Sequence, residues 1–222
     1  MNALLFLLIL IIPAIAQMLV SGSYSKYRQI ENEKKLTGYD VARMILDQND
    51  LKDMYIVETK GTLTDHYDPN QKVIRLSESI YNDTSIASLA VAAHECGHAL
   101  QDKEGYLYMR VRSFLFPIVN IATTFSYLII ACGLIFQLLN LIWIGIGCVT
   151  TGLIFQIVTL PVEIDASKRA KKEIESLKIA SQKDQDGVRT MLSAAASTYV
   201  AGVLTSALEL LRLIMAFTGR ED

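Results

Sequence analysis

The sequence predicts a mainly α-helical membrane protein with about four transmembrane helices and a small α+β domain. Composition is the first reason: 51% of the 222 residues are hydrophobic and 20% are charged, and the mean hydropathy is +0.31, which is typical of membrane proteins. The second reason is that the charged residues gather in blocks between long uncharged segments. The net charge of -2 does not indicate a basic surface, so no nucleic-acid partner is expected.

Residues 1–25 carry no charged side chain and are mostly apolar, so we expect an N-terminal transmembrane anchor. A cleaved signal peptide is the alternative, since the Ala-Ile-Ala sequence at 14–16 resembles a cleavage site. The ten residues that follow hold four basic side chains, Lys26, Arg28, Lys34 and Lys35. Basic residues keep their side of a first helix in the cytoplasm, which favours an uncleaved anchor with its N-terminus outside.

Residues 26–112 form the only long polar section and predict a small soluble domain. Thr37 can cap a helix over about 38–49, and a second helix is expected to begin near 83–85 and to run to about 101. Three β-like runs lie between these helices, at 54–58, 62–65 and 72–76. The third run directly precedes the second helix, a position from which a strand can pair with an extended substrate. Such pairing needs the free backbone groups of an edge strand, so we expect the third run to lie at the sheet edge.

The second of these helices carries an H-E-x-x-H motif at 94–98. His94 and His98 are four residues apart, so both side chains lie on one helix face and can bind a single Zn²⁺. Glu95 lies beside them, where it can take a proton from zinc-bound water, whose pKa the metal lowers to about 7. Gly97 weakens a helix and is expected to allow close approach of another segment. The motif predicts a zinc hydrolase; two incidental histidines on a buried helix are the alternative.

Residues 113–162 carry no charged side chain and are long enough for two spans, with a turn near 137–140. Basic residues flank this transmembrane hairpin on both outer ends and are missing from the turn. That asymmetry places the polar domain and both hairpin ends on the cytoplasmic side.

A catalytic zinc usually has a third protein ligand, and Glu163 is the first acidic residue after the hairpin. A returning hairpin would bring Glu163 to the membrane face where His98 lies, so we predict Glu163 as the third ligand, with zinc at the bilayer surface. A carboxylate that only begins a solvated interfacial helix is the alternative reading of Glu163. Other candidate ligands are Asp102, Glu104, Asp165 and Glu173. Asp102 is also a candidate partner for the second ring nitrogen of His98.

The remaining chain is expected to form a cytoplasmic segment at 163–189 and a C-terminal transmembrane helix with a tail at 190–222. The cytoplasmic segment consists of a lysine- and glutamate-rich helix to about 180 and a polar linker at 181–187. An interfacial helix is the alternative for the last apolar segment. Glu209 and Arg212 interrupt that segment three residues apart, and we expect them to pair on a protein-facing side.

His66 is the only other histidine. A zinc hydrolase needs a donor that stabilises the oxyanion, and His66 lies in a loop near the third β-like run, so we predict a catalytic role for it. The alternative is that a histidine in a D-H-Y-D-P turn satisfies local backbone groups.

Three segments together resemble the YugP-type family of bacterial membrane zinc metallopeptidases: L-T-D-H-Y-D-P at 63–69, V-A-A-H-E-C-G-H-A-L-Q at 91–101 and P-V-E-I-D-A-S-K-R-A at 161–170. The resemblance covers nearly the whole chain. More distantly the chain is similar to the gluzincins that include the CAAX-prenyl and heat-shock membrane proteases, which implies a gluzincin-like catalytic domain.

The resemblance assigns zinc to His94, His98 and Glu163, and the role of general base to Glu95. The chain departs from the wider group at Ser167, where those proteases commonly have an aspartate, and Asp165 is the candidate replacement. The family also implies a bacterial, multi-pass protein of the cell membrane.

Together these features predict a membrane-embedded zinc metalloendopeptidase with residues 26–112 as its cytoplasmic catalytic domain. It is expected to act at the cytoplasmic face of the membrane on a peptide or membrane-protein substrate, with the lipid bilayer as its other partner. A zinc-binding scaffold or chaperone that does not cut peptides is the alternative, and a transporter with an incidental motif is a third reading. The oligomeric state is left open.

Overall fold

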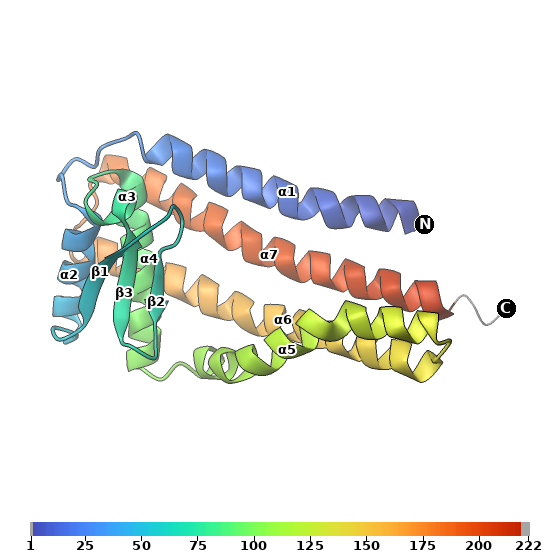
Figure 1. The fold of residues 1–222 in the computed structure, drawn as a ribbon. Coiled ribbons are helices and arrows are strands. Elements are labelled where there is room, and N and C mark those ends of the chain that lie inside the picture. Colours follow the sequence, from blue (N-terminus) through green and yellow to red (C-terminus); the bar gives the residue numbers. More distant parts are fainter. Residues whose placement is uncertain (1, 219–222) are drawn as a thin grey trace. The chain divides into compact units, whose positions relative to one another are not determined.

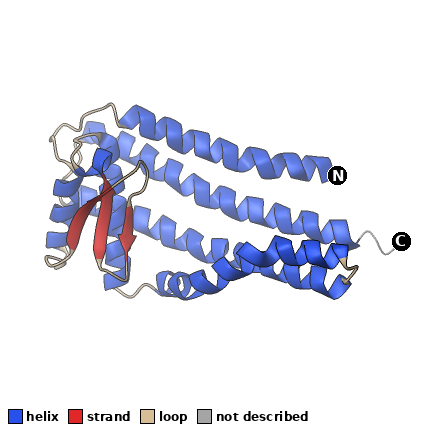
Figure 2. Cartoon of the chain, in the orientation of Figure 1, coloured by secondary structure: helices blue, strands red, loops and turns tan. Residues whose placement is uncertain are grey.

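The structure is a computed structural model that describes residues 2–218, and it is mainly helical (Figures 1 and 2). Residue 1 of the predicted anchor and residues 219–222 of the predicted tail lie outside the described residues. Within residues 2–218, four helices are long and apolar enough to cross a membrane, which confirms the predicted number. They are α1 (Asn2–Tyr27), α5 (Leu107–Ile135), α6 (Leu139–Ser176) and α7 (Gln182–Thr218).

The chain folds into two compact units. The helical unit consists of residues 2–17, 107–161 and 198–218, and the α+β unit consists of residues 18–106 and 162–197. Helices α1, α6 and α7 each contribute residues to both units.

The short elements of the α+β unit form where the sequence pattern expects two helices and a small sheet. Helix α2 (Gly38–Gln48) begins with a capping box, in which Thr37 and Asp40 bond each other's backbone N–H groups. Helix α4 (Ile86–Lys103) carries the H-E-x-x-H motif and begins at Ser85, whose side chain accepts from the Ser88 N–H. Both helices were expected at these positions. The short helix α3 (Glu78–Tyr81) precedes α4.

The sheet contains β1 (Tyr55–Thr59), β2 (His66–Asp68) and β3 (Val73–Ser77) in the order β1-β3-β2 (Figure 2). Strand β3 pairs with β1 in parallel and with β2 in antiparallel orientation. The prediction of an edge strand at 72–76 was therefore wrong. Val73, Ile74 and Leu76 are all buried, because a central strand packs both of its faces against other residues.

The edge strand beside the motif helix is β2, which forms at 66–68 and not at the predicted 62–65. Gly61 and Leu63 both have positive φ angles, of 108° and 58°. This backbone conformation is incompatible with an extended strand. Residues 62–65, predicted as a strand, therefore lie in the turn, and residues 66–68, predicted as part of the turn, form strand β2.

Helix α6 is longer than the predicted span, because it continues without a break through Pro161 into the predicted cytoplasmic helix. The predicted linker at 181–187 was wrong, since α7 begins at Gln182. Ser181 Oγ accepts from the Asp184 N–H at 3.2 Å and donates to the Asp184 carboxylate at 2.9 Å. This side-chain cap satisfies the first backbone groups of the helix and explains why a polar sequence is helical here.

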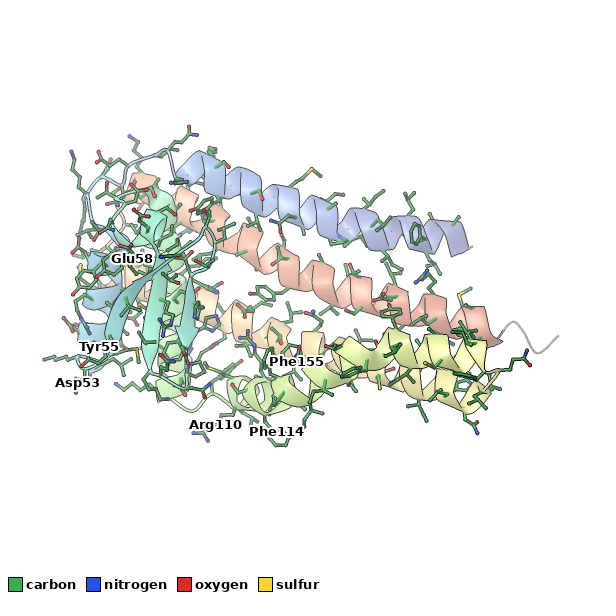
Figure 3. The ribbon with its side chains drawn as sticks, in the orientation of Figure 1. Asp53, Tyr55, Glu58, Arg110, Phe114 and Phe155 are labelled. Carbon is green, nitrogen blue, oxygen red and sulfur yellow. The ribbon has the colours of Figure 1, made fainter. Side chains whose placement is uncertain are left out.

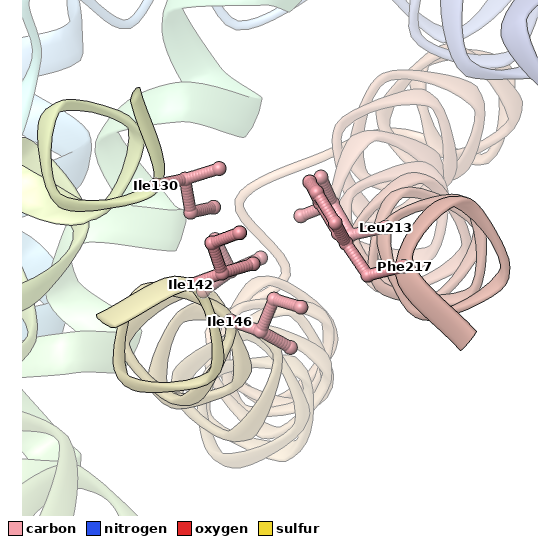
Figure 4. Close-up of a cluster of buried hydrophobic side chains, with 6 residues drawn as sticks. Ile130, Ile142, Ile146, Leu213 and Phe217 are labelled. Atoms are coloured by element: carbon pink, nitrogen blue, oxygen red, sulfur yellow. The ribbon is translucent and has the colours of Figure 1, made fainter. Parts of the chain in front are cut away.

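In the helical unit, buried hydrophobic side chains of α5, α6 and α7 pack against one another. Its core cluster consists of six buried residues, Ile130, Ile142, Ile146, Val149, Leu213 and Phe217 (Figure 4). A Cβ atom on Gly145 would lie 3.0 Å from the Ser126 carbonyl oxygen, so this glycine lets α5 and α6 approach closely. Only 6% to 22% of each apolar span is buried within the protein, which is consistent with lipid as the surrounding solvent.

Candidate metal centre

Three side chains that can bind a metal ion, from two helices, meet in the α+β unit. His94 and His98 come from α4, and Glu163 comes from α6. The Glu163 Oε2 atom lies 3.3 Å from His94 Nε2 and 3.4 Å from His98 Nε2. Ligand atoms of all three residues lie within 4.8 Å of one another. Glu163 and His98 are buried, and His94 is nearly so.

This arrangement fits zinc. Bonds of about 2.0–2.2 Å from a tetrahedral Zn²⁺ to nitrogen and oxygen place neighbouring ligand atoms about 3.3 Å apart. The two histidine-to-glutamate distances match that separation. Two imidazoles and one carboxylate are also the donor set of a catalytic zinc site, which keeps a fourth position for water or substrate.

The other predicted ligands are engaged elsewhere. Glu104 accepts from Arg169 at 2.7 Å, and Glu173 accepts from the Asn49 amide at 3.0 Å. Asp102 accepts from the Tyr67 hydroxyl at 2.6 Å and pairs with Lys72. Among the predicted carboxylates, the structure brings only Glu163 to the two histidines.

Glu95 lies beside these ligands and is 8% exposed. Burial raises the pKa of its carboxyl to about 7, and the nearby carboxylates of Glu163 and Asp65 add to this effect, while His94 opposes it. Its Oε2 atom accepts from the Tyr67 N–H of β2 at 2.9 Å. The edge strand therefore aims the predicted general base.

His66 lies on β2 next to Tyr67, but its side chain is exposed. Its Nδ1 atom is 2.8 Å from the carbonyl oxygen of Thr64, which is the local backbone contact given above as the alternative. The residue of this strand that contacts Glu95 is Tyr67, through its backbone. A catalytic role for His66 stays a prediction.

The second ring nitrogen of His98 is bound by Gln101, so the prediction of Asp102 for this position was wrong. His98 Nδ1 lies 3.0 Å from Gln101 Oε1. Both Gln101 and Asp102 lie on the helix turn after His98, but Tyr67 and Lys72 draw Asp102 toward the sheet. Sequence reasoning missed Gln101, although its position three residues after a predicted ligand is a usable signal.

The orientation of the Gln101 amide follows from its other partners. Its Nε2 atom donates to the Val162 carbonyl oxygen at 2.7 Å and to Asp165 Oδ2 at 2.9 Å. Both of these partners only accept hydrogen bonds, so Oε1 must face His98. It then accepts the Nδ1 proton, which leaves Nε2 of His98 free for a metal.

Ser167 contacts the other histidine of the candidate site. Its Oγ atom lies 3.2 Å from His94 Nδ1. The expectation that Asp165 replaces an aspartate at position 167 was wrong, because Ser167 itself occupies that place. Asp165 accepts from Gln101 and from Arg169 Nε, the latter at 2.6 Å, and so it contacts His98 only through Gln101.

Gly97 permits this arrangement, as expected from the motif. A Cβ atom at this position would lie 2.4 Å from the carbonyl oxygen of Ala166, which is closer than any side chain allows. The backbone of α6 therefore passes directly over α4 at the metal-binding face.

Comparison with known proteins agrees with this geometry. Residues 2–218 match the family described as "Putative neutral zinc metallopeptidase". The chain is 44% identical over 207 residues to a protein of Bacillus subtilis (strain 168) described as "Putative membrane protease YugP". That alignment covers 93% of this chain and 92% of the relative. No solved structure matches the chain.

Replacing Gln101 with leucine should lower zinc affinity by about 10- to 100-fold, as expected for loss of a partner that orients a ligand. The measurement is competition with a chelator on the purified protein. Gln48→Leu is the matched control, since Gln48 is exposed at the end of α2, and it should retain full affinity. Equal affinities for the two variants would contradict the role assigned to Gln101.

Replacing Gly97 with alanine should destabilise the protein by about 1–3 kcal/mol, the usual cost of overpacking, because the added methyl group would collide with the Ala166 carbonyl. The measurement is thermal unfolding in detergent. Gly147→Ala is the control, because a Cβ atom there meets nothing within 4 Å. A Tm for Gly97→Ala at or above that of the control would show that the two helices are not in close contact.

Proposed function

Because this chain belongs to the YugP-type family of zinc metallopeptidases, we propose that it is a membrane zinc metalloendopeptidase whose active site faces the cytoplasm. The observation that carries the proposal is the meeting of His94, His98 and Glu163 beside the buried Glu95. A site that only binds metal needs the three ligands, whereas a buried carboxylate beside them is what hydrolysis requires in addition.

Zinc and Glu95 would have different roles in peptide hydrolysis. Bound zinc supplies Lewis acidity, which lowers the pKa of water and polarises a peptide carbonyl. Glu95 takes the proton of the attacking water and delivers it to the amine that leaves. A pKa of about 7 suits a group that must first accept and then donate a proton near neutral pH.

The neighbours of the ligands hold the geometry during this cycle. Gln101 and Ser167 contact the outer nitrogens of the two histidines, so both rings present Nε2 to the metal. The Tyr67 N–H keeps the Glu95 carboxylate in place. Pre-positioned groups of this kind need no reorganisation as the reaction proceeds.

Strand β2 is the proposed site for the substrate backbone. It is an edge strand that pairs with β3 on one side, and its residue Tyr67 contacts the general base. An extended peptide can add to such an edge through main-chain hydrogen bonds. This arrangement favours an endopeptidase that accepts unfolded or extended segments.

The cytoplasmic orientation rests on the distribution of basic residues. Lys26 lies in the last turn of α1, and Arg28, Lys34 and Lys35 follow that helix. Lys168, Arg169, Lys171 and Lys172 follow Glu163. The turn between α5 and α6 has no basic residue. Basic residues next to membrane spans are retained in the cytoplasm.

Replacing Glu95 with glutamine should leave zinc bound and lower peptide cleavage by about 10²- to 10⁴-fold, the usual contribution of a general base. Zinc content and hydrolysis of a casein-type substrate would be measured on the same preparation, with and without a chelator. The control is Glu175→Gln, at an exposed carboxylate whose Oε1 atom lies 3.8 Å from Arg189 Nη2. If Glu95→Gln cleaved at the wild-type rate, the mechanism would be wrong. Stoichiometric zinc without cleavage by the wild type would favour the scaffold alternative.

Replacing Glu163 with alanine should abolish stoichiometric zinc binding, because only the two histidines would remain as protein ligands. Metal analysis of the purified variant tests this. Glu173→Ala is the control: it removes another carboxylate from α6, one that bonds Asn49, and should keep its zinc. Full occupancy in Glu163→Ala would mean that another group completes the site.

A further inference from the structure

The helical unit contains a polar cavity that the metal site does not use. Its volume is about 280 Å³, and α5, α6 and α7 line it. Seven of its twelve lining residues are polar or charged. They include Asn120, Tyr127, Gln156, Ser206 and Glu209. Phe116 and Tyr127 line it and are 58% and 48% exposed, so the cavity is accessible from the side of the helices.

A second cavity, of about 290 Å³, adjoins the first. It lies between α1, α6 and α7, and it shares Gln156 and Ser206 with its neighbour. Thr205 also lines it, and the Thr205 Oγ1 atom is buried without a hydrogen-bond partner among the described residues. Each volume is near the lower end of the ~300–1,000 Å³ range of ligand pockets.

The Gln156 amide is held between the two cavities. A Cβ atom on Gly202 of α7 would lie 3.0 Å from Gln156 Oε1, so the missing side chain at Gly202 makes room for the amide. Glu209 of α7 accepts a hydrogen bond from the Tyr127 hydroxyl of α5. Its predicted partner, Arg212, instead lies with its guanidinium 5.9 Å from the centroid of the Phe6 ring.

An amide and a carboxylate within membrane-spanning helices are costly, and where they occur they face a protein or water-filled space and mark functional sites. Hydroxyl side chains on the same helices are satisfied in a different way, by carbonyl groups of their own helix. Thr123 bonds the carbonyl oxygen of Val119 on its own helix at 2.8 Å, and Thr150 bonds that of Ile146 at 2.9 Å. Gln156 and Glu209 are instead directed to the cavities and to other helices.

We propose that these cavities bind the unwound backbone of a membrane-inserted substrate segment. This proposal rests on the peptidase function proposed above and names its substrate class. A peptide must be extended to be cleaved, and its N–H and C=O groups then need partners that lipid does not offer. The Glu209 carboxylate accepts from N–H groups, and the Gln156 amide can accept and donate.

Two further features fit such an occupant. The rings of Phe116 and Phe155 lie with their centroids 6.1 Å apart, and they offer apolar surface to the side chains of the segment. Phe155 is labelled on α6 in Figure 3. Gln156 belongs to α6, the helix that also contains the candidate ligand Glu163.

The experiment compares two substrates with one scissile sequence, using the full chain reconstituted in phosphatidylcholine vesicles. One substrate is a synthetic peptide with an apolar segment of about 20 residues interrupted by the scissile sequence, and the other is the scissile sequence as a soluble peptide. The measured quantity is kcat/KM for the membrane peptide divided by kcat/KM for the soluble peptide. In Gln156→Leu and in Glu209→Leu this ratio should fall about tenfold, which corresponds to the loss of one hydrogen bond to a polar or charged group. Gln137→Leu, in the turn before α6, should keep the wild-type ratio. An unchanged ratio in both cavity variants would overturn the proposal.

A binding measurement keeps the test independent of catalysis and of variant stability. A benzophenone side chain replaces Phe116 in Glu95→Gln protein, and illumination should cross-link it to the membrane peptide and not to the soluble one. The same replacement at Phe114, which is exposed and does not line the cavity, is the control. Equal cross-linking at both positions, or none at Phe116, would reject the cavity as the binding site. Cleavage of neither peptide by wild type would reject the peptidase function while this measurement still decides the cavity.

Discussion

The metal site depends on the close approach of α4 and α6. Gly97 removes the side chain that would separate the two helices, and Gln101 then fixes their relative position. Its amide bonds His98 on one side and the Val162 carbonyl oxygen on the other. Because Glu163 directly follows Val162, the same side chain positions a ligand on each helix. One buried amide thus positions both His98 and Glu163, which are 65 positions apart in the chain.

One strand of the sheet holds Glu95, the proposed general base. Strand β3 is buried at the centre, while β2 lies at the edge and directs its Tyr67 N–H to Glu95. A buried carboxylate needs such a donor, because burial without hydrogen bonds is costly for a charged group. The exposed turn that leads into β2 is thereby connected to Glu95, and the same edge has backbone groups that can recognise an extended chain.

The helical unit follows a different rule because its surroundings are apolar. Most of its large hydrophobic side chains are exposed, and its short hydroxyl side chains bond carbonyl groups of their own helices. Longer polar side chains cannot be satisfied in this way and gather at the contacts of α5, α6 and α7. Their concentration around two cavities is the feature that distinguishes this unit from a simple membrane anchor.

The sequence by itself determined the helices α2 and α4, four segments long and apolar enough to cross a membrane, and the residues of the motif. These properties are local: helix geometry alone puts His94 and His98 on one face, and length and composition alone decide whether a segment can cross lipid. Glu163 could also be predicted as a ligand, because the charge pattern requires a hairpin that returns to its starting side. Only the tertiary structure decided the strand order, the position of the edge strand at 66–68, and the partners of the two histidines. Those features depend on which of several neighbouring polar groups finds a partner from a distant segment, and no local pattern records that choice. Gln101 and Asp102 are adjacent in the chain, yet one bonds a metal ligand and the other bonds the sheet.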